Sequence, residues 1–183
     1  MIKIIDNCCS PYYLDCLKGI ASSSDNWHFQ YPPIAPIEDR FPKLEIFNNG
    51  LRQPLLAGLA MGLLIQIYEA SGRSLFILDP IAFCGISIKD RLQKDIIHTD
   101  YEKDIGMIKI FGIINSDWKE EWGGEFFHDG TSNYIKPTSF CVFDGSEPHA
   151  AAAILTDKKR FAIDFAVFRD QQSLNRVRGI GNK

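Results

Sequence analysis

The sequence has too few cysteines for a disulfide-stapled protein, and it contains no Cys-x-x-Cys motif. Its five cysteines, Cys8, Cys9, Cys16, Cys84 and Cys141, form an odd number without paired spacing. Such a set is typical of reduced, packed thiols in a cytosol-like compartment, and it argues against a thiolate zinc site. We therefore expect a cytoplasmic protein.

Long apolar runs are also missing. The longest candidate, 55–67, is shorter than the roughly 20 residues that a membrane-spanning helix needs, and polar residues interrupt its far end. Residues 1–6 lack a basic segment followed by an apolar core, so we expect no secretory signal. A membrane is therefore not an expected partner.

The chain has no excess of positive charge, since its formal net charge is −3 and its pI is about 5.8. Proteins that bind a phosphate backbone usually gather Lys and Arg, so this balance makes nucleic acid an unlikely partner. The length of 183 residues and the 45% of apolar residues suit one folded domain with a proper core.

The first 73 residues are predicted to form mostly helical support. Ser10 followed by Pro11 is a helix-start signal, and it predicts a helix to about Ile20. Residues 51–70 are apolar nearly all round, so they predict a helix that must be covered by a sheet. The proline-rich segment 32–42 is either a surface crossing or a flap over a substrate.

From residue 74 onward, short β-rich runs alternate with turn signals. The predicted strands are 75–78, 81–88, 96–100, 107–114, 125–128, 132–136, 139–143, 150–155 and 160–168. Many short strands at such spacing indicate a sandwich, barrel or jelly roll rather than a parallel α/β sheet. We expect a single domain over 1–183, with a jelly-roll core in 74–168 and a tail in 169–183.

The stretch His98-Thr99-Asp100 is the candidate centre of the chemistry. On an extended strand alternate side chains share a face, so His98 and Asp100 would project together. An imidazole beside a carboxylate supplies two-thirds of a 2-His-1-carboxylate triad, which holds iron(II) and leaves other coordination positions open. The interpretation requires a third ligand farther along the chain.

Further motifs follow in a characteristic order. They are Asn115-Ser116-Asp117-Trp118, a Gly123-Gly124-Glu125 turn, the run Asp144-Gly145-Ser146-Glu147-Pro148-His149, and the basic cluster Lys158-Lys159-Arg160. From about residue 96 to residue 168, this ordered set resembles the iron(II)/2-oxoglutarate dioxygenases, in particular the prolyl-4-hydroxylase-type branch. The resemblance implies a mainly β fold (α+β), a double-stranded β-helix of the cupin-like jelly-roll type with supporting N-terminal helices.

The resemblance also implies the residues of the site. His98, Asp100 and His149 would bind Fe(II), with 2-oxoglutarate in two of the remaining positions and O2 in the third; ascorbate would support turnover. The carboxylate of Asp100 distinguishes this chain from halogenating relatives, in which a small residue replaces it. Arg160 would bind the distal carboxylate of 2-oxoglutarate, because a guanidinium offers two parallel hydrogen bonds. Lys159 is the alternative, and the strand register decides between them; Arg160 begins the apolar strand, which favours it as the residue that points inward.

The chain departs from the family pattern at one point. Relatives often carry a tyrosine on the strand after the His-x-Asp loop that binds the cosubstrate, whereas residues 109–114 contain no hydroxyl group. Tyr101 and Ser87 are candidates for this second partner. His28 and His128 have no carboxylate at ligand spacing, so we predict structural roles for them, with His128 at the surface or a sheet edge.

Together these features predict a 2-oxoglutarate-dependent oxygenase that hydroxylates a C–H bond. The substrate would be a prolyl or other side chain of a peptide or protein, or a small molecule. One alternative is a nucleobase demethylase on the same scaffold, which the acidic balance disfavours. The other is a non-catalytic, cupin-like metal-binding or sensor module, which would bind metal without releasing succinate.

Overall fold

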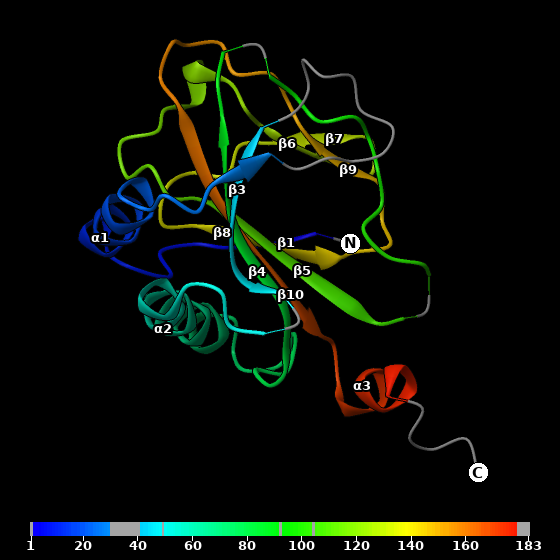
Figure 1. Ribbon diagram of the computed structural model, residues 1–183. Coiled ribbons are helices and arrows are strands. Elements are labelled where there is room, and N and C mark those ends of the chain that lie inside the picture. The colour runs from blue at the N-terminus through cyan, green and yellow to red at the C-terminus, as the bar shows by residue number, and fades with distance from the viewer. Residues whose placement is uncertain (1, 30–40, 49, 92, 104, 179–183) are drawn as a thin grey trace.

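Two sheets form the β-rich body of the protein (Figure 1). The computed structural model describes residues 2–29, 41–48, 50–91, 93–103 and 105–178. The large sheet has the strand order β1 (Lys3–Ile5), β8 (Phe140–Asp144), β5 (Met107–Ile113), β10 (Arg160–Phe168), β4 (Ile81–Lys89), β3 (Pro42–Asn48), β2 (His28–Phe29). The small sheet has the order β7 (Thr131–Asn133), β6 (Phe126–His128), β9 (His149–Ala151). Neighbouring strands run antiparallel, and the architecture is a jelly roll.

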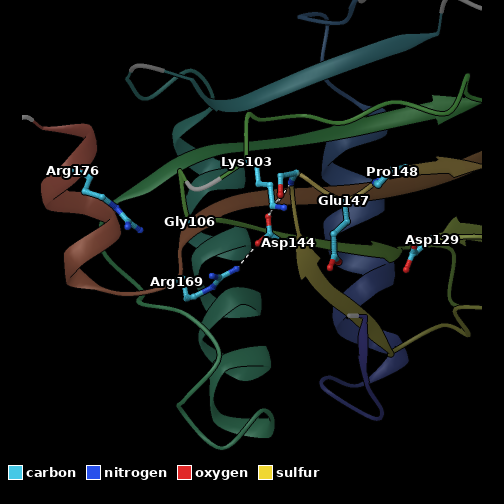
Figure 2. A pocket seen from close by; sticks show the side chains of 9 residues that line it. Lys103, Gly106, Asp129, Asp144, Glu147, Pro148, Arg169 and Arg176 are labelled. Carbon is cyan, nitrogen blue, oxygen red and sulfur yellow. Dashed lines mark hydrogen bonds and ion pairs between the residues drawn. The ribbon is translucent and has the colours of Figure 1, made fainter.

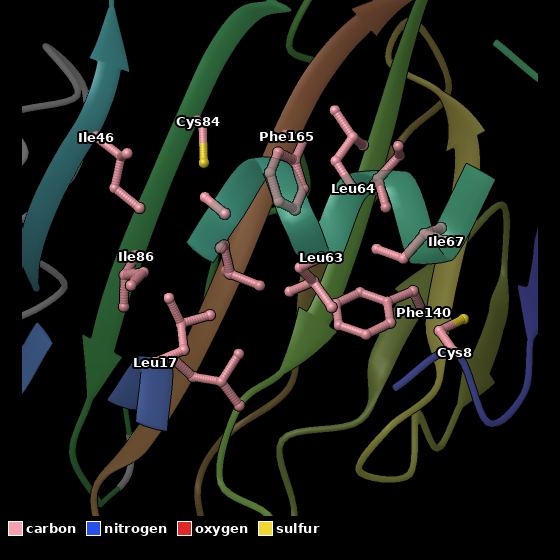
Figure 3. Packing of buried hydrophobic residues seen from close by; sticks show 14 of the residues in the cluster. Cys8, Leu17, Ile46, Leu63, Leu64, Ile67, Cys84, Ile86, Phe140 and Phe165 are labelled. Atoms are coloured by element: carbon pink, nitrogen blue, oxygen red, sulfur yellow. The ribbon is translucent and has the colours of Figure 1, made fainter. Parts of the chain in front are cut away.

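Helices α1 (Pro11–Ser22) and α2 (Pro54–Ala70) cover one face of the large sheet (Figure 1). The N-cap Ser10 accepts a hydrogen bond from the backbone N–H of Tyr13 at 3.2 Å, and Pro11 opens the first turn of α1. Figure 3 shows side chains of α2, among them Leu63 and Leu64, packed with sheet residues that include Phe165. Burial of these apolar faces is the main force that holds the helices on the sheet.

Strand β10 shows why the two faces of the large sheet differ. Its alternate residues Phe161, Ile163, Phe165 and Val167 belong to the core under the helices. With a period of two, the residues between them, from Arg160 to Ala166, point to the opposite face. That face meets the small sheet through a cluster of Phe126, Cys141 and Phe143, against which Phe111 packs. Over residues 160–167 of β10 the large apolar side chains therefore point toward the helices, and the polar and small side chains point toward the interior between the sheets.

Several predicted elements differ in the structure. Residues 75–78 are not a strand, although Phe76 is buried, and residues 96–100 pair with the sheet only through a bridge at His98. Residues 42–48 form β3, which was not predicted although Leu44 and Ile46 alternate with polar residues. The N-terminal part thus supplies β1, β2 and β3 to the large sheet as well as two helices.

The expected tail contains a further helix, α3 (Gln171–Val177), which packs at the end of β10 (Figure 1). Asp170 caps it by accepting a hydrogen bond from the backbone N–H of Ser173 at 2.7 Å. The proline-rich segment 32–42 lies outside the described residues except for Phe41 and Pro42. Among the helices that the structure describes, none is long and apolar enough to cross a membrane.

Candidate metal centre

Backbone pairing places the two predicted histidine ligands opposite each other. The N–H of His98 donates to the carbonyl of His149 at 3.0 Å, and the N–H of His149 donates back at 2.9 Å. The N–H of Asp100 donates to the carbonyl of Gly145 at 2.9 Å, which holds the loop before His149 against the His-x-Asp segment. Two segments about 50 residues apart in the chain are therefore joined at the site.

The ligand atoms of His98, Asp100 and His149 all lie within 4.8 Å of one another. His149 Nε2 is 3.3 Å from Asp100 Oδ2, and His98 Nε2 is 3.9 Å from Asp100 Oδ1. The side chain of His149 is 7% exposed and that of His98 is 46% exposed. The cluster is thus buried on the His149 side and open to solvent on the His98 side.

The other ring nitrogen of each histidine faces a backbone carbonyl. His98 Nδ1 lies 2.7 Å from the carbonyl oxygen of Ile96, and His149 Nδ1 lies 2.9 Å from that of Glu147. A ring that donates its proton from Nδ1 keeps a lone pair on Nε2, which is how metal-binding histidines are usually oriented. Both Nε2 atoms are directed at Asp100, so the donor set suits a divalent transition metal.

A buried lysine contacts the carboxylate of the cluster. Lys109 Nζ lies 3.3 Å from Asp100 Oδ2 and 2.7 Å from Asp164 Oδ2. Burial raises the pKa of Asp100, but the hydrogen bond with His149 and the charge of Lys109 outweigh it and bring the pKa well below its usual value. Asp100 is therefore ionised at neutral pH, as a metal ligand must be.

The strand register turns Arg160 inward and Lys159 outward. Arg160 is 1% exposed and donates from Nη1 to the carbonyl of Gly124 at 2.7 Å, whereas the side chain of Lys159 is 63% exposed. Burial lowers the pKa of Arg160 to about 10, against the opposing charges of Asp95 and Glu125, so the guanidinium remains charged at neutral pH. In the described part of the chain, Arg160 Nε is a buried donor without a hydrogen-bond acceptor. An anion that accepts a hydrogen bond from Nε would complement such a group.

Sequence reasoning missed Lys89, Asp95, Lys109 and Asp164. Lys89 is directly opposite Arg160 on β4, and Asp95, which forms an ion pair with Lys89, lies three residues before His98. Lys109 and Asp164 could have been found from the alternation of side chains along β5 and β10, because it places both residues on the interior face. Their contacts depend on pairing between distant strands.

Tyr101 and Ser87, the two candidates for a second partner of the 2-oxoglutarate carboxylate, lie in different parts of the structure. Tyr101 packs with the cluster of Met107 and Phe168, at the end of β10 opposite to Arg160. Ser87 is opposite Ala162 on β10, next to the Arg160 pair. The structure thus separates Tyr101 from Arg160 by most of a strand.

The expectation that His128 lies at the surface or a sheet edge is wrong. It occupies the central strand of the small sheet, is 3% exposed, and its Nε2 lies 2.8 Å from Glu147 Oε2. Glu147 is 19 residues away in sequence, and only the β6–β9 pairing brings it near. His128 therefore has a carboxylate partner but lies outside the three-residue cluster.

A separate polar pocket of about 530 Å³ lies beside the loop that leads to His149 (Figure 2). Its lining includes Asp144, Glu147 and Pro148 and the basic residues Arg169 and Arg176, but none of the three cluster residues. Arg169 is paired with Asp144 across this pocket. The wall of the pocket carries charges of both signs.

Gly124 fixes the position of Arg160, and we expect its replacement to be costly. A Cβ on Gly124 would meet Arg160 Nη1 at 2.7 Å and Ile154 Cδ1 at 2.8 Å. Gly124→Ala should therefore destabilise the protein by about 1–3 kcal/mol more than an alanine at a glycine that has the same positive φ but open space around it. Gly130→Ala is the matched control, because Gly130 has a similar φ of 80° with nothing within 4 Å. Equal urea midpoints for the two variants would contradict the tight packing.

Comparisons with known proteins identify the fold. No family model matches the sequence, and no curated protein matches it. Among solved structures, a prolyl-4-hydroxylase from Pseudomonas putida is 15% identical with a TM-score of 0.63, covering 92% of each chain. A Trichoplax adhaerens prolyl hydroxylase, in complex with a hypoxia inducible factor peptide fragment, is 14% identical with a TM-score of 0.68, over 94% of this chain and 86% of that one. HygX from Streptomyces hygroscopicus, with nickel and 2-oxoglutarate bound, is 10% identical with a TM-score of 0.67, over 93% and 83%. The chain shares the jelly-roll fold of the 2-oxoglutarate/iron(II) oxygenases.

Proposed function

We propose that this protein is an iron(II)- and 2-oxoglutarate-dependent oxygenase that hydroxylates a C–H bond. One observation carries the proposal: the His98–Asp100–His149 cluster shares the interior of this fold with a buried arginine whose Nε has no acceptor. The donor set suits iron(II), and Arg160 suits one end of a dicarboxylate.

Different residues of this chain would bind the metal and the cosubstrate. His98, Asp100 and His149 would hold the metal on one face, and Arg160 would bind the distal carboxylate of 2-oxoglutarate. When bound, iron(II) and 2-oxoglutarate supply the oxidation with dioxygen, and 2-oxoglutarate leaves as succinate and carbon dioxide. Lys109, held by Asp164, keeps the carboxylate of Asp100 directed at the cluster.

A small residue lies on β10 between Arg160 and the aspartate that is linked to the cluster. Ala162 lies between Arg160 and Asp164 on the same face of β10, and Asp164 is linked through Lys109 to Asp100. A small side chain at this position supports a cosubstrate that extends along the strand from the arginine to the metal.

The open His98 side of the cluster is the proposed side of substrate approach. A prolyl or other side chain of a peptide fits this exposure, and the peptide complex of the Trichoplax enzyme supports it by analogy. A small-molecule substrate is the second candidate on the same observation. We place the protein in the cytoplasm on its free cysteines, of which Cys8, Cys84 and Cys141 are buried.

The test is release of succinate from 2-oxoglutarate with iron(II) and ascorbate, followed by mass spectrometry of candidate peptides and small molecules for a gain of one oxygen. A methylated nucleobase should be included, because loss of its methyl group would indicate the demethylase alternative. Binding of metal and 2-oxoglutarate without succinate release under any of these conditions would favour the sensor module instead.

Metal and cosubstrate should stabilise the folded protein. Ligands that bind only the native state add about 2.7 kcal/mol at a concentration of 100 times Kd. We therefore expect manganese(II), a redox-silent mimic of iron(II), to raise the melting temperature, and 2-oxoglutarate to raise it further when manganese is present. Magnesium(II) is the control, since it prefers oxygen ligands. An unchanged melting temperature with manganese at millimolar concentration would contradict the metal site.

A further inference from the structure

A second buried cation lies beside Arg160. Lys89 is the register partner of Arg160 on the neighbouring strand β4, so the two side chains leave the sheet on the same face. Lys89 is 2% exposed, and its Nζ lies 4.6 Å from the ring centroid of Phe41. A buried ammonium is costly unless an anion accompanies it, so its surroundings indicate what it binds.

The anion that accompanies Lys89 is Asp95. Asp95 Oδ1 accepts a hydrogen bond from Lys89, and Asp95 Oδ2 accepts one from the backbone N–H of Ala151 at 3.0 Å. Burial raises the pKa of Asp95, but the charges of Lys89 and Arg160 outweigh it, so the carboxylate is ionised. Asp95 is therefore a carboxylate that both cations share, and Glu125, whose charge also acts on Arg160, is only partly buried.

Among the described residues, Arg160 is the member of this group with an unsatisfied donor. Arg160 Nε is fully buried without a partner among the described residues. The neighbouring strand β5 offers Phe111, whose ring centroid is 5.7 Å from Arg160 Cζ, and Ile113, which is opposite Ala162. Neither side chain can form a hydrogen bond, so these two β5 residues give a carboxylate bound at Arg160 no second partner.

We propose that Lys89 and Arg160 together bind the distal carboxylate of 2-oxoglutarate, with Asp95 positioning the lysine. This inference rests on the proposed function. It assigns to Lys89 the place of the tyrosine hydroxyl that relatives often carry and that residues 109–114 lack. An ammonium can donate three hydrogen bonds, so contact with Asp95 and with a ligand carboxylate is compatible. Asp95 also ties this cation pair to the metal-binding segments, since it lies three residues before His98 and binds Ala151, two residues after His149.

The experiment compares two ligands on the full chain loaded with manganese(II) under anaerobic conditions. The first is 2-oxoglutarate, and the second is 2-oxopentanoate, which keeps the chelating end but has a methyl group in place of the distal carboxylate. Calorimetric titration gives the dissociation constant of each ligand. The ratio of the two constants measures how much the residues around the distal carboxylate contribute to binding. Because chelation contributes to both constants, a general weakening of the metal site leaves the ratio unchanged.

The main variant removes the ion pair as a unit. Lys89→Met/Asp95→Asn removes one positive and one negative charge together and keeps the net charge of the group, so a loss of affinity does not come from a change in net charge. We expect the preference for 2-oxoglutarate to fall about 10-fold or more, with little change for 2-oxopentanoate. Lys89→Arg should keep most of the preference. Lys94→Met is the matched control, because Lys94 is exposed and adjacent to Asp95.

The outcomes separate the two proposals. If the parent protein binds 2-oxoglutarate and the double variant keeps the full preference, Lys89 does not contact the cosubstrate and this inference is overturned. If the parent shows no preference for 2-oxoglutarate, the proposed function fails first. Melting temperatures check that each variant is folded, and Lys89→Gln, with the same expected loss, replaces the double variant if that protein does not fold.

Discussion

Replacing Asp100 with alanine should abolish oxidation while leaving the fold intact. The carboxylate is the only anionic member of the proposed ligand set, so its loss removes charge and one coordination bond from the metal. The fold should survive because the side chain is 26% exposed and Lys109 keeps its 2.7 Å contact with Asp164. We expect activity to fall by more than about 100-fold, the upper end of the effect of changing a residue that only supports a metal ligand.

Succinate release and manganese(II) affinity should both be measured for this variant. Asp157→Ala is a suitable control, since Asp157 has an 86% exposed side chain that forms an ion pair with the exposed Arg91. Near-normal product formation by Asp100→Ala would mean that another carboxylate binds the metal. Asp164 would then be the first candidate, because it shares Lys109 with Asp100.

Replacing Arg160 with alanine should weaken 2-oxoglutarate binding without changing metal affinity. The variant would leave the distal carboxylate of 2-oxoglutarate in a buried site with one charge partner fewer. Truncating one partner of a buried charge pair costs about 2–5 kcal/mol, which corresponds to a loss of affinity of about 30-fold or more. Arg160→Lys should fall between the two, because a point charge replaces a two-pronged donor.

The measurement is a titration of 2-oxoglutarate into the anaerobic iron-loaded protein, followed by its metal-to-ligand absorption band. Lys159→Ala is the matched control, since Lys159 is adjacent in sequence but points to solvent. A loss of affinity in Lys159→Ala and not in Arg160→Ala would contradict the orientation of β10. If neither variant binds 2-oxoglutarate differently, the cosubstrate assignment is wrong and the metal-binding module becomes the better explanation.

Local patterns in the sequence predicted much of this architecture. The capped start of α1, the apolar helix α2 and most strands from β4 to β10 follow from periodicity and turn residues. The place of Arg160 at the start of the apolar strand 160–168 favoured the arginine over Lys159 as the inward-pointing residue, and in the structure Arg160 is buried and Lys159 is exposed. These features depend on neighbouring residues along one chain segment, so the sequence carries the information directly.

The parts that were missed depend on contacts between distant segments. The glutamate partner of His128, and the pairing of Lys109 with both Asp100 and Asp164, exist only because separate strands adopt one register. The ligand motif itself showed the same limit: periodicity predicted a strand at 96–100, but this segment forms a single bridge, at His98. Sequence spacing predicted that His98 and Asp100 point the same way. Their approach to His149, and the place of Lys89 beside Arg160, were decided by strand pairing, because hydrogen bonds between strands fix which residues lie opposite each other.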